Sequence, residues 1–341
     1  MPSWIIDVSD KTKVKLFQVP AITNERYVAL SYCWGTDRQT TMLTLYNKYG
    51  LLSGIDPHHL DPTIRDSVMV TRELEFRFLW IDALCIFQDD KEWKTKELGI
   101  MGKLCQNATL TIVASTTKDV KEGFLHCRVS TTDRASLLNK HPPGVLKFRA
   151  QGTSEEGDEK PVILTQPMED DMEPWYERAW TLQEMLFSGR QLRFRNNQTT
   201  WLCHCTEPPA RECDGWMSGR AHVPENHWDS NFKEIMPMMR GGKGRTWNSE
   251  VLSNWYDLIE VYSCRKLRYR DDRLPAMSGI ARGFVSILGD QYMCGFVEVR
   301  FNNRSDVLVN MGCSGTEGIV VLEEEEDRYS RDGLISKTYG Q

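Results

Sequence analysis

The chain has 341 residues, of which 40% are hydrophobic and 26% charged, a composition typical of a globular protein with its own core. Its formal net charge of −6 argues against a nucleic-acid-binding protein, because phosphate contacts require a basic face. We find no signal peptide and no apolar run of the roughly 18 residues that a membrane span requires. We therefore expect a cytoplasmic protein without a membrane partner, in which the ten cysteines are thiols.

Strands and helices are predicted to alternate in the first third of the chain. Residues 27–34, YVALSYCW, form an apolar run that ends at Gly35, as expected of a buried strand. Pro62 opens a stretch with apolar side chains at helical spacing. The predicted order is strand 27–34, helix 62–75, strand 78–85, helix 90–106 and strand 109–114. This alternation is typical of a parallel α/β sheet flanked by helices.

The rest of the chain is predicted to be less regular. We expect a surface loop at residues 140–160, because it is rich in Pro, Gly and charged residues. Residues 178–188 are predicted to be helical, and residues 190–205 to form a hairpin. The predicted parts are an α/β core (1–205), an irregular Trp- and Met-rich long loop or lid (206–247), a helical C-terminal part packed on the core (248–320, with helix over 249–285) and an acidic tail (321–341).

Several sequence runs resemble the fungal heterokaryon incompatibility (HET) domain in content, order and spacing. They are YVALSYCWG (27–35), FLWIDALCIFQDD (78–90), NATLTI (107–112), GFL (123–125) and ERAWTLQE (177–184). The later run YSCRKLRYRDDRLPAMSGIA (262–281) resembles a segment that often follows the domain. The chain departs from the family at Phe87, where Asn is usual, and at Leu104-Cys105, where Ile-Tyr is usual.

The resemblance also carries expectations about the fold. HET domains have been likened to TIR domains, which are flavodoxin-like α/β folds, so the resemblance implies a TIR/flavodoxin-like core for residues 1–205. The nucleotide-binding or repeat modules that are fused to some HET proteins are not seen here, so we expect a stand-alone member of the family.

A candidate site is predicted where the strands end. In an open parallel sheet, ligands bind beyond the carboxyl ends of the strands. Ser31, Tyr32 and Trp34 lie at the end of the first apolar run, and Asp82 lies near the end of the second. A buried carboxylate needs a partner, and the Arg178 guanidinium could supply it as a bidentate ion pair. The pair could take part in chemistry or could only position the helix that follows Arg178.

Glu184 is the second candidate for chemistry. It shares a helical face with Trp180, four residues earlier. Burial beside aromatic rings would raise its pKa and suit it to general acid–base catalysis. TIR-type NAD hydrolases use a glutamate on a helix, so the resemblance points to this region, with Glu92 and Glu97 as rival positions. The alternative is a glutamate that only forms structural hydrogen bonds.

The remaining candidates are weaker. Gln88 and Gln183 could anchor a ligand through their amides. Cys85 could be a nucleophile only beside a base, and no histidine lies in the matching runs, so a buried packing role is the stronger alternative. Cys203 and Cys205 lack a regularly spaced second pair of ligands, so no metal site is predicted.

Three functions compete at this point. We favour a cofactor-independent enzyme of a natural-product pathway, because the Trp- and Met-rich segment could close over an apolar metabolite during a cyclisation such as an intramolecular Diels–Alder reaction. The family implies the alternative of an incompatibility or programmed-cell-death protein, with NAD as the substrate if it is TIR-like. The third is an inert binding scaffold. The predicted catalytic residues are Asp82, Arg178 and Glu184, and the predicted substrate-binding residues are Ser31, Tyr32, Trp34, Cys85, Gln88, Trp180 and Gln183.

Overall fold

The computed structural model describes thirteen stretches of the chain. They are residues 1–20, 24–36, 39–125, 145–150, 160–165, 173–195, 199–204, 210–213, 249–288, 292–293, 296–301, 304–309 and 319–320. The chain divides into two compact units, of which the first contains Met1–Phe124 and Pro174–Gln341 and the second contains Leu125–Glu173. All of the candidate site residues belong to the first unit.

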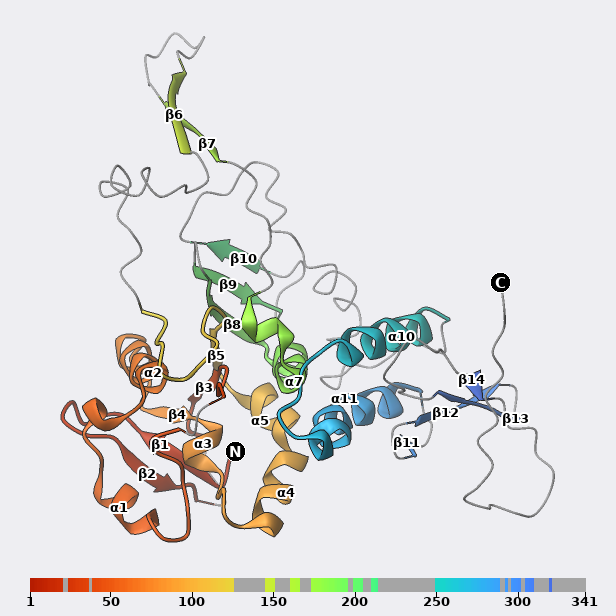
Figure 1. Cartoon of the computed structure of the whole chain (residues 1–341), viewed down its shortest axis with the longest axis horizontal. Helices are drawn as coiled ribbons and strands as arrows, with labels where there is room; N and C mark the ends of the chain where they lie inside the picture. Colours follow the sequence, from red (N-terminus) through yellow and green to blue (C-terminus); the bar gives the residue numbers. More distant parts are fainter. Residues whose placement is uncertain are drawn as a thin grey trace. The chain divides into compact units, whose positions relative to one another are not determined.

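An eight-stranded mixed sheet forms the centre of the first unit (Figure 1). Its strands are β1 (Trp4–Asp7), β2 (Lys15–Gln18), β3 (Tyr27–Ser31), β4 (Phe78–Trp80), β5 (Leu110–Ala114), β8 (Arg190–Phe194), β9 (Thr199–Cys203) and β10 (Ala210–Cys213). Their order across the sheet is β10-β9-β8-β5-β3-β4-β1-β2. The central strands β8, β5, β3 and β4 are parallel, whereas the outer strands are antiparallel. The predicted α/β fold with a parallel sheet is confirmed for this centre.

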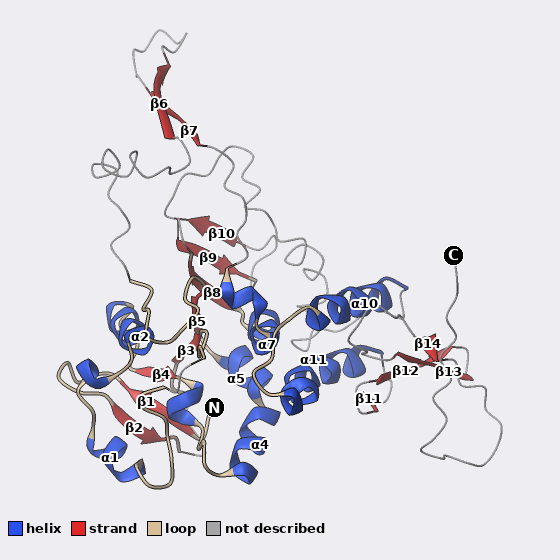
Figure 2. Ribbon diagram, viewed as in Figure 1, coloured by secondary structure: helices blue, strands red, loops and turns tan. Residues whose placement is uncertain are grey.

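Helices flank the sheet (Figure 2). They are α1 (Lys48–Ser53), α2 (Pro62–Glu73), α3 (Asp82–Cys85), α4 (Lys91–Gly99), α5 (Met101–Asn107), α7 (Ala179–Phe187), α10 (Ser249–Ser263) and α11 (Arg273–Leu288), with 3-10 turns at Pro57–His59, Pro174–Glu177 and Arg270–Asp272. Pro62 occupies the first position of α2, where its missing N–H removes no hydrogen bond. Among the described helices, none is both long enough and apolar enough to cross a bilayer.

The side chains of β3 show which helices cover which face of the sheet. Alternate residues of a strand point to the same face, so Tyr27 and Ser31 share one. The Tyr27 hydroxyl donates to the carbonyl oxygen of Leu104 on α5 at 2.6 Å, and the Ser31 hydroxyl donates to Glu184 on α7. Helices α5 and α7 therefore lie on the same face of the sheet, and they also pack against each other.

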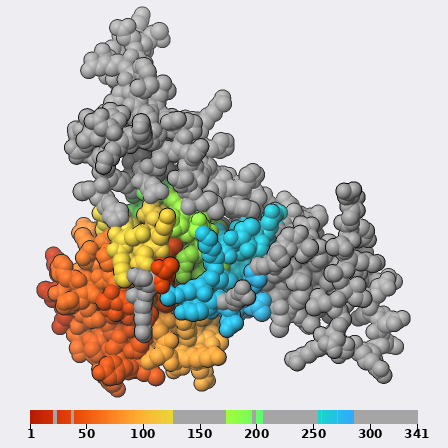
Figure 3. All heavy atoms as spheres, in the orientation of Figure 1, coloured from red at the N-terminus to blue at the C-terminus, as the bar shows by residue number. Residues whose placement is uncertain are grey.

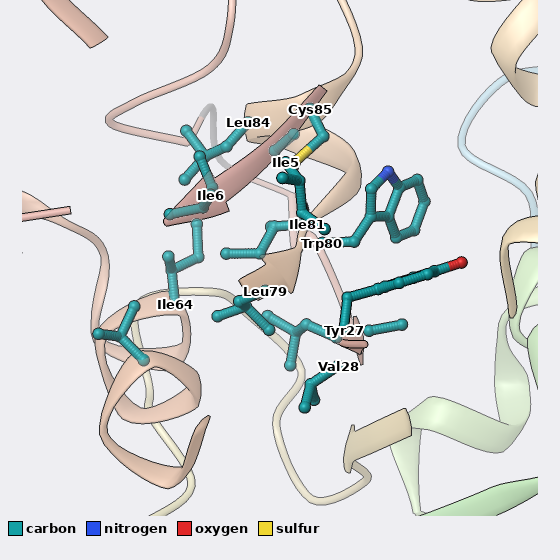
Figure 4. Close-up of a cluster of buried hydrophobic side chains, with 14 of the residues drawn as sticks. Ile5, Ile6, Tyr27, Val28, Ile64, Leu79, Trp80, Ile81, Leu84 and Cys85 are labelled. Atoms are coloured by element: carbon teal, nitrogen blue, oxygen red, sulfur yellow. Dashed lines mark hydrogen bonds between the residues drawn. The ribbon is translucent and has the colours of Figure 1, made fainter. Parts of the chain in front are cut away.

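Two hydrophobic clusters hold this unit together. The first joins β1, β3, β4, α2 and α3, and Figure 4 shows Ile5, Ile6, Tyr27, Val28, Ile64, Leu79, Trp80, Ile81, Leu84 and Cys85 packed within it. The second joins α7, α10 and α11 through side chains that include Leu182, Trp255 and Phe284. Helix α11 also packs against α4 and α5, and in Figure 3 the cyan and blue atoms of residues 249–288 adjoin the atoms of the first 125 residues.

The prediction of a strand over residues 78–85 is wrong in its second half. The strand β4 ends at Trp80, and Asp82 begins the short helix α3. The amides of Leu84 and Cys85 donate to the Ile81 carbonyl oxygen at 3.0 and 2.8 Å. Three of the four α3 residues are buried, so the apolar run continues through a change of backbone that hydrophobicity alone does not reveal.

Several strands lie outside the predicted set. Strands β1 and β2 extend the sheet at its N-terminal edge, and β10 extends it into the segment that was predicted to be a loop or lid. Strands β11 (Tyr292–Met293), β12 (Phe296–Phe301), β13 (Arg304–Val309) and β14 (Ile319–Val320) form a four-stranded sheet where a helical part was predicted. The FVEVRF sequence of β12 has the two-residue period of a strand. This alternation is the pattern from which β12 could have been predicted.

The second unit contains a hairpin of β6 (Val145–Ala150) and β7 (Lys160–Thr165), which pair antiparallel. A surface loop was predicted over residues 140–160, so the loop prediction is wrong for β6. Most of the predicted lid and the whole of the predicted acidic tail, residues 321–341, lie outside the described residues.

Gly35, which follows the end of β3, offers a test of the turn there. Its φ is +82°, and a Cβ would lie 1.7 Å from Asp119 Oδ2 and 2.9 Å from Asp119 Cα. We expect Gly35→Ala to lower the free energy of unfolding by about 1–3 kcal/mol, measured by urea denaturation. The control Gly50→Ala in α1, where a Cβ would meet nothing within 4 Å, should be neutral or stabilising by up to ~1 kcal/mol. Equal effects of the two substitutions would contradict this account.

Candidate functional site

The order of the parallel strands places a topological switch point in the sheet. In chain order these strands are β3, β4, β5 and β8, and across the sheet the first lies between the second and the third, as in the flavodoxin-like arrangement. The chain leaves β3 for β4 on one side and then crosses to β5 on the other. The switch point therefore lies between the carboxyl ends of β3 and β5, at Ser31 and Ala114. Ligands of open α/β sheets bind at this position.

A buried hydrogen-bonded group of three side chains lies at the carboxyl end of β3. The Ser31 hydroxyl donates to Glu184 Oε2. The Trp175 indole Nε1 donates to Ser31 Oγ at 2.6 Å. The exposed fractions of Ser31, Glu184 and Trp175 are 2%, 8% and 0%. The serine hydroxyl is thus fixed between one donor and one acceptor, with little access to water.

Burial raises the pKa of Glu184 to about 7, because a desolvated carboxyl group favours its neutral form. The hydrogen bond from Ser31 opposes this rise, and the negative charge of Asp82 adds to it. The positive charges of Arg178 and Arg265 favour the ionised form and lower the pKa. The outcome is a carboxyl group that can both accept and release a proton near neutral pH, as a general acid–base group requires.

Asp82 lies beside this group, at the first position of α3. Its Oδ2 accepts a hydrogen bond from Trp34 Nε1 at 2.7 Å, and its Oδ1 accepts one from the Ala83 amide at 2.7 Å. Burial raises the pKa of Asp82, and the charge of Arg178 opposes that rise. The indole and the helix amide therefore satisfy both carboxylate oxygens.

The predicted bidentate pair between Asp82 and Arg178 is wrong. Among the ion pairs of the described residues, none joins these two side chains. The Arg178 guanidinium instead donates through Nη1 to the Tyr32 carbonyl oxygen. Arg178 thus ties the start of α7 to the chain just beyond β3, and it acts on Asp82 through its charge alone.

The Tyr32 side chain is also held within the protein. Its hydroxyl donates to Gln39 Oε1 at 3.0 Å, and burial raises the pKa of Tyr32 well above its usual value. The structure thus brings together six of the predicted site residues, namely Ser31, Tyr32, Trp34, Asp82, Arg178 and Glu184. Of these, Trp34, Asp82 and Arg178 are the half-buried ones, so they form the more accessible side of the site.

The other predicted residues lie in structural positions around this group. Cys85 is 1% exposed within the hydrophobic cluster of Figure 4, and burial raises the pKa of its thiol. The Gln88 amide donates to the carbonyl oxygens of Asp82 and Ile86, at 3.3 and 2.9 Å. The Trp180 indole donates to Asp272 Oδ2 at 3.3 Å. Their predicted contacts with a substrate stay predictions.

The Gln183 side chain lies next to the helices α5 and α11. A Cβ at Gly279 on α11 would lie 1.7 Å from Gln183 Nε2, and one at Gly102 on α5 would lie 3.3 Å from the same atom. The Gln183 side chain therefore fills the space between α5 and α11. Because neighbouring residues of a helix differ by about 100° in direction, Glu184 can face the sheet while Gln183 faces these helices.

Two residues of the site were not assigned to it from the sequence. Trp175 supplies the donor to Ser31, and Arg265 donates to the Arg178 carbonyl oxygen at 3.0 Å. Trp175 lies beside a run that resembles the HET domain, and Arg265 lies within the run that resembles a segment following it, so the resemblance pointed to both regions. Their partners lie 144 and 87 residues away in the chain, so no local pattern reveals these contacts.

Comparison with known proteins finds a family model and a distant relative that each match part of the chain. The family model described as Heterokaryon incompatibility protein (HET) matches residues 27–184. Heterokaryon incompatibility protein 6, OR allele, of Neurospora crassa is 29% identical over 104 residues, which cover 29% of this chain and 15% of that protein. The similarity thus spans about 15% of the relative's length. No solved structure matches the chain.

The raised pKa of Glu184 makes the stability of the protein depend on pH. The folded value of about 7 lies above the unfolded value of about 4.3, so the folded state binds this proton more tightly. The resulting stabilisation is complete below about pH 4 and is lost as the pH rises through about 7. We expect the free energy of unfolding of the wild-type protein to fall by about 3 kcal/mol relative to Glu184→Gln over this range, measured by urea denaturation.

The control for this prediction is Glu92→Gln, which changes an exposed glutamate on α4. Its free energy of unfolding should differ from that of the wild-type protein by no more than about 1 kcal/mol at any pH, the scale of one charge in the first turn of a helix. If Glu184→Gln differs from the wild type by the same amount at about pH 4 and about pH 8, Glu184 does not titrate as described.

Proposed function

We propose that the protein acts in fungal incompatibility and that its switch-point site hydrolyses NAD, starting from the match of residues 27–184 to the heterokaryon incompatibility family model. The observation that carries the proposal is the buried Glu184 carboxyl group, hydrogen-bonded to Ser31 at the carboxyl end of β3. Its pKa of about 7 suits proton transfer at neutral pH. The notion of NAD as the substrate comes from the likeness of HET domains to TIR domains.

In the proposed reaction Glu184 acts as a general base. Water attacks the ribose carbon of the N-glycosidic bond, and nicotinamide leaves with the bonding electron pair. The attacking water gives its proton to the Glu184 carboxylate, which later releases it to solvent. The Ser31 hydroxyl orients that carboxylate, and the negative charge of Asp82 faces the positive charge that develops on the ribose.

The half-buried side of the site is the proposed entry for the substrate. Trp34 is held by Asp82 at 2.7 Å, so its ring has a fixed orientation on which a base or nicotinamide ring can stack. Glu184 is 8% exposed, so the proposal requires the surrounding chain to open before the substrate touches it. Such opening movements are common in enzymes that exclude water from the reaction.

The cyclisation of an apolar metabolite stays a prediction. It rested on the Trp- and Met-rich segment at residues 206–247, of which the structure describes β10 alone. The family match and the relative's name bear on incompatibility and not on natural-product chemistry. We therefore treat cyclisation as an outcome of the test below.

The proposal is tested by incubating the purified full chain with NAD, and separately with a fungal metabolite extract, and analysing the products by mass spectrometry. We expect the wild-type protein to release nicotinamide, and Glu184→Gln to do so at least about 100-fold more slowly, since the variant cannot accept the proton. Induced expression in a filamentous fungus should lower viability with the wild-type chain and not with Glu184→Gln.

Glu92→Gln tests the rival glutamate on α4, and this exposed residue should keep both NAD cleavage and toxicity when it is changed. Intact NAD together with an isomeric product from an apolar metabolite would overturn the proposed reaction in favour of cyclisation. Toxicity that persists in Glu184→Gln would show that the cellular role does not depend on the Glu184 carboxyl group, which contradicts the proposal.

A further inference from the structure

A segment far along the chain lies against the start of α7. The Lys266 amide donates to the Glu177 carbonyl oxygen at 2.5 Å, and the Ala179 amide donates to the Lys266 carbonyl oxygen at 3.0 Å. These bonds form a parallel bridge between Arg178 and Lys266. The Lys266 ammonium also pairs with Glu177 Oε2 at 2.6 Å. The backbone on either side of Arg178 is therefore held by residues that lie beyond the family match at 27–184.

Arg265 carries this connection into the buried site. Its side chain is 9% exposed, and its Nη1 donates to the Arg178 carbonyl oxygen at 3.0 Å and to Thr181 Oγ1 at 3.1 Å. The Thr181 hydroxyl in turn donates to the carbonyl oxygen of Trp175 at 2.6 Å, whose indole holds Ser31. The Arg265 guanidinium thus supports the 3-10 turn that carries Trp175 and the start of α7, where Arg178 lies.

The same segment also contacts the chain that continues from β3. Arg268 Nη2 donates to the Thr36 carbonyl oxygen at 3.3 Å, on the chain that continues from β3. Asp272 accepts the hydrogen bond of the Trp180 indole at 3.3 Å. Residues 265–272 therefore contact both segments that supply the site, one leading from Ser31 and the other leading to Glu184.

We infer that residues 265–272 form a strap that completes the candidate site, with Arg265 as the positioning residue for Glu184 and Arg178. The strap fixes the start of α7 relative to the end of β3, and Arg265 does so through its hydrogen bonds to the Arg178 carbonyl oxygen and to Thr181. The inference deepens the proposed function and rests on it for its effect on NAD cleavage. A carboxyl group can act on a substrate only if such supporting contacts hold it within a fraction of an ångström.

The charge of Arg265 distinguishes this role from a purely structural one. That charge lowers the pKa of Glu184 against the effect of burial. Replacing a residue that only filled space would not raise the titration midpoint of Glu184, because looser packing admits water and lowers the pKa of a buried carboxyl group. The titration midpoint of Glu184 is therefore the informative measurement, and it does not depend on any enzymatic activity.

The test compares Arg265→Gln and Arg265→Lys in the full chain. The Glu184 carboxyl resonance is identified in ¹³C spectra by its loss in Glu184→Gln and is followed against pH. We expect Arg265→Gln to move the midpoint upward by at least about 0.5 pH units, and Arg265→Lys, which keeps the charge, to restore most of that shift. A midpoint that is unchanged in a folded Arg265→Gln would overturn the inference.

Arg268→Gln provides a second test that does not disturb a buried residue, since Arg268 is exposed. We expect the Trp34 indole N–H resonance, assigned with Trp34→Phe, to shift in this variant while that of Trp4 on β1 stays in place. An unmoved Trp34 resonance would overturn the strap even if Arg265→Gln failed to fold.

The activity measurement separates the inference from the proposed function. If the wild-type chain cleaves NAD, Arg265→Gln should lower the rate at least about tenfold and move the pH profile in the same direction as the Glu184 midpoint, with Arg265→Lys close to the wild type. If the wild-type chain leaves NAD intact while the Glu184 midpoint shifts as expected, the proposed function fails and the strap stands.

Discussion

The burial of the Glu184 carboxyl group is the constraint on which the rest of the site depends. A carboxyl group away from water must find hydrogen bonds within the protein or remain neutral. Ser31 supplies the bond, and Trp175 fixes the Ser31 hydroxyl in turn. Both bonds require α7 and the turn before it to lie directly over the carboxyl end of β3. The position of α7 on the sheet therefore decides whether the buried polar groups of the site find hydrogen-bond partners.

Several contacts hold α7 in this position. At the end of α7, the Ser188 hydroxyl donates to the Glu184 carbonyl oxygen at 2.6 Å and lies 2.8 Å from the Thr111 hydroxyl of β5. At its start, Arg178 bonds to the Tyr32 carbonyl oxygen. Along its outer side, Gln183 packs against α11. The helix is thus fixed at both ends and on its outer side, and the orientation of Glu184 follows from this.

The buried carboxyl group has an energetic cost that depends on pH. A protonatable carboxyl group held in a nearly dry environment costs stability at neutral and higher pH, because the charged form is poorly solvated there. Destabilising groups of this kind are found more often at functional sites than elsewhere in proteins. The matched HET range, residues 27–184, contains this group, whereas part of its support comes from residues 265–272. The buried carboxyl group therefore depends for its structural support on residues outside the matched range.

The sequence by itself determined the parallel α/β centre, since the period and length of apolar runs such as residues 27–34 and 109–114 are local properties. It also indicated that polar residues at strand ends, such as Ser31 and Asp82, would gather at one edge of the sheet. Only the tertiary structure decided their partners. Asp82 bonds to Trp34 and not to Arg178, because a helix begins at Asp82 and offers its own amide. The contacts of Trp175 and Arg265 with the site join residues 144 and 87 positions apart, and packing over such separations leaves no periodic trace in the chain.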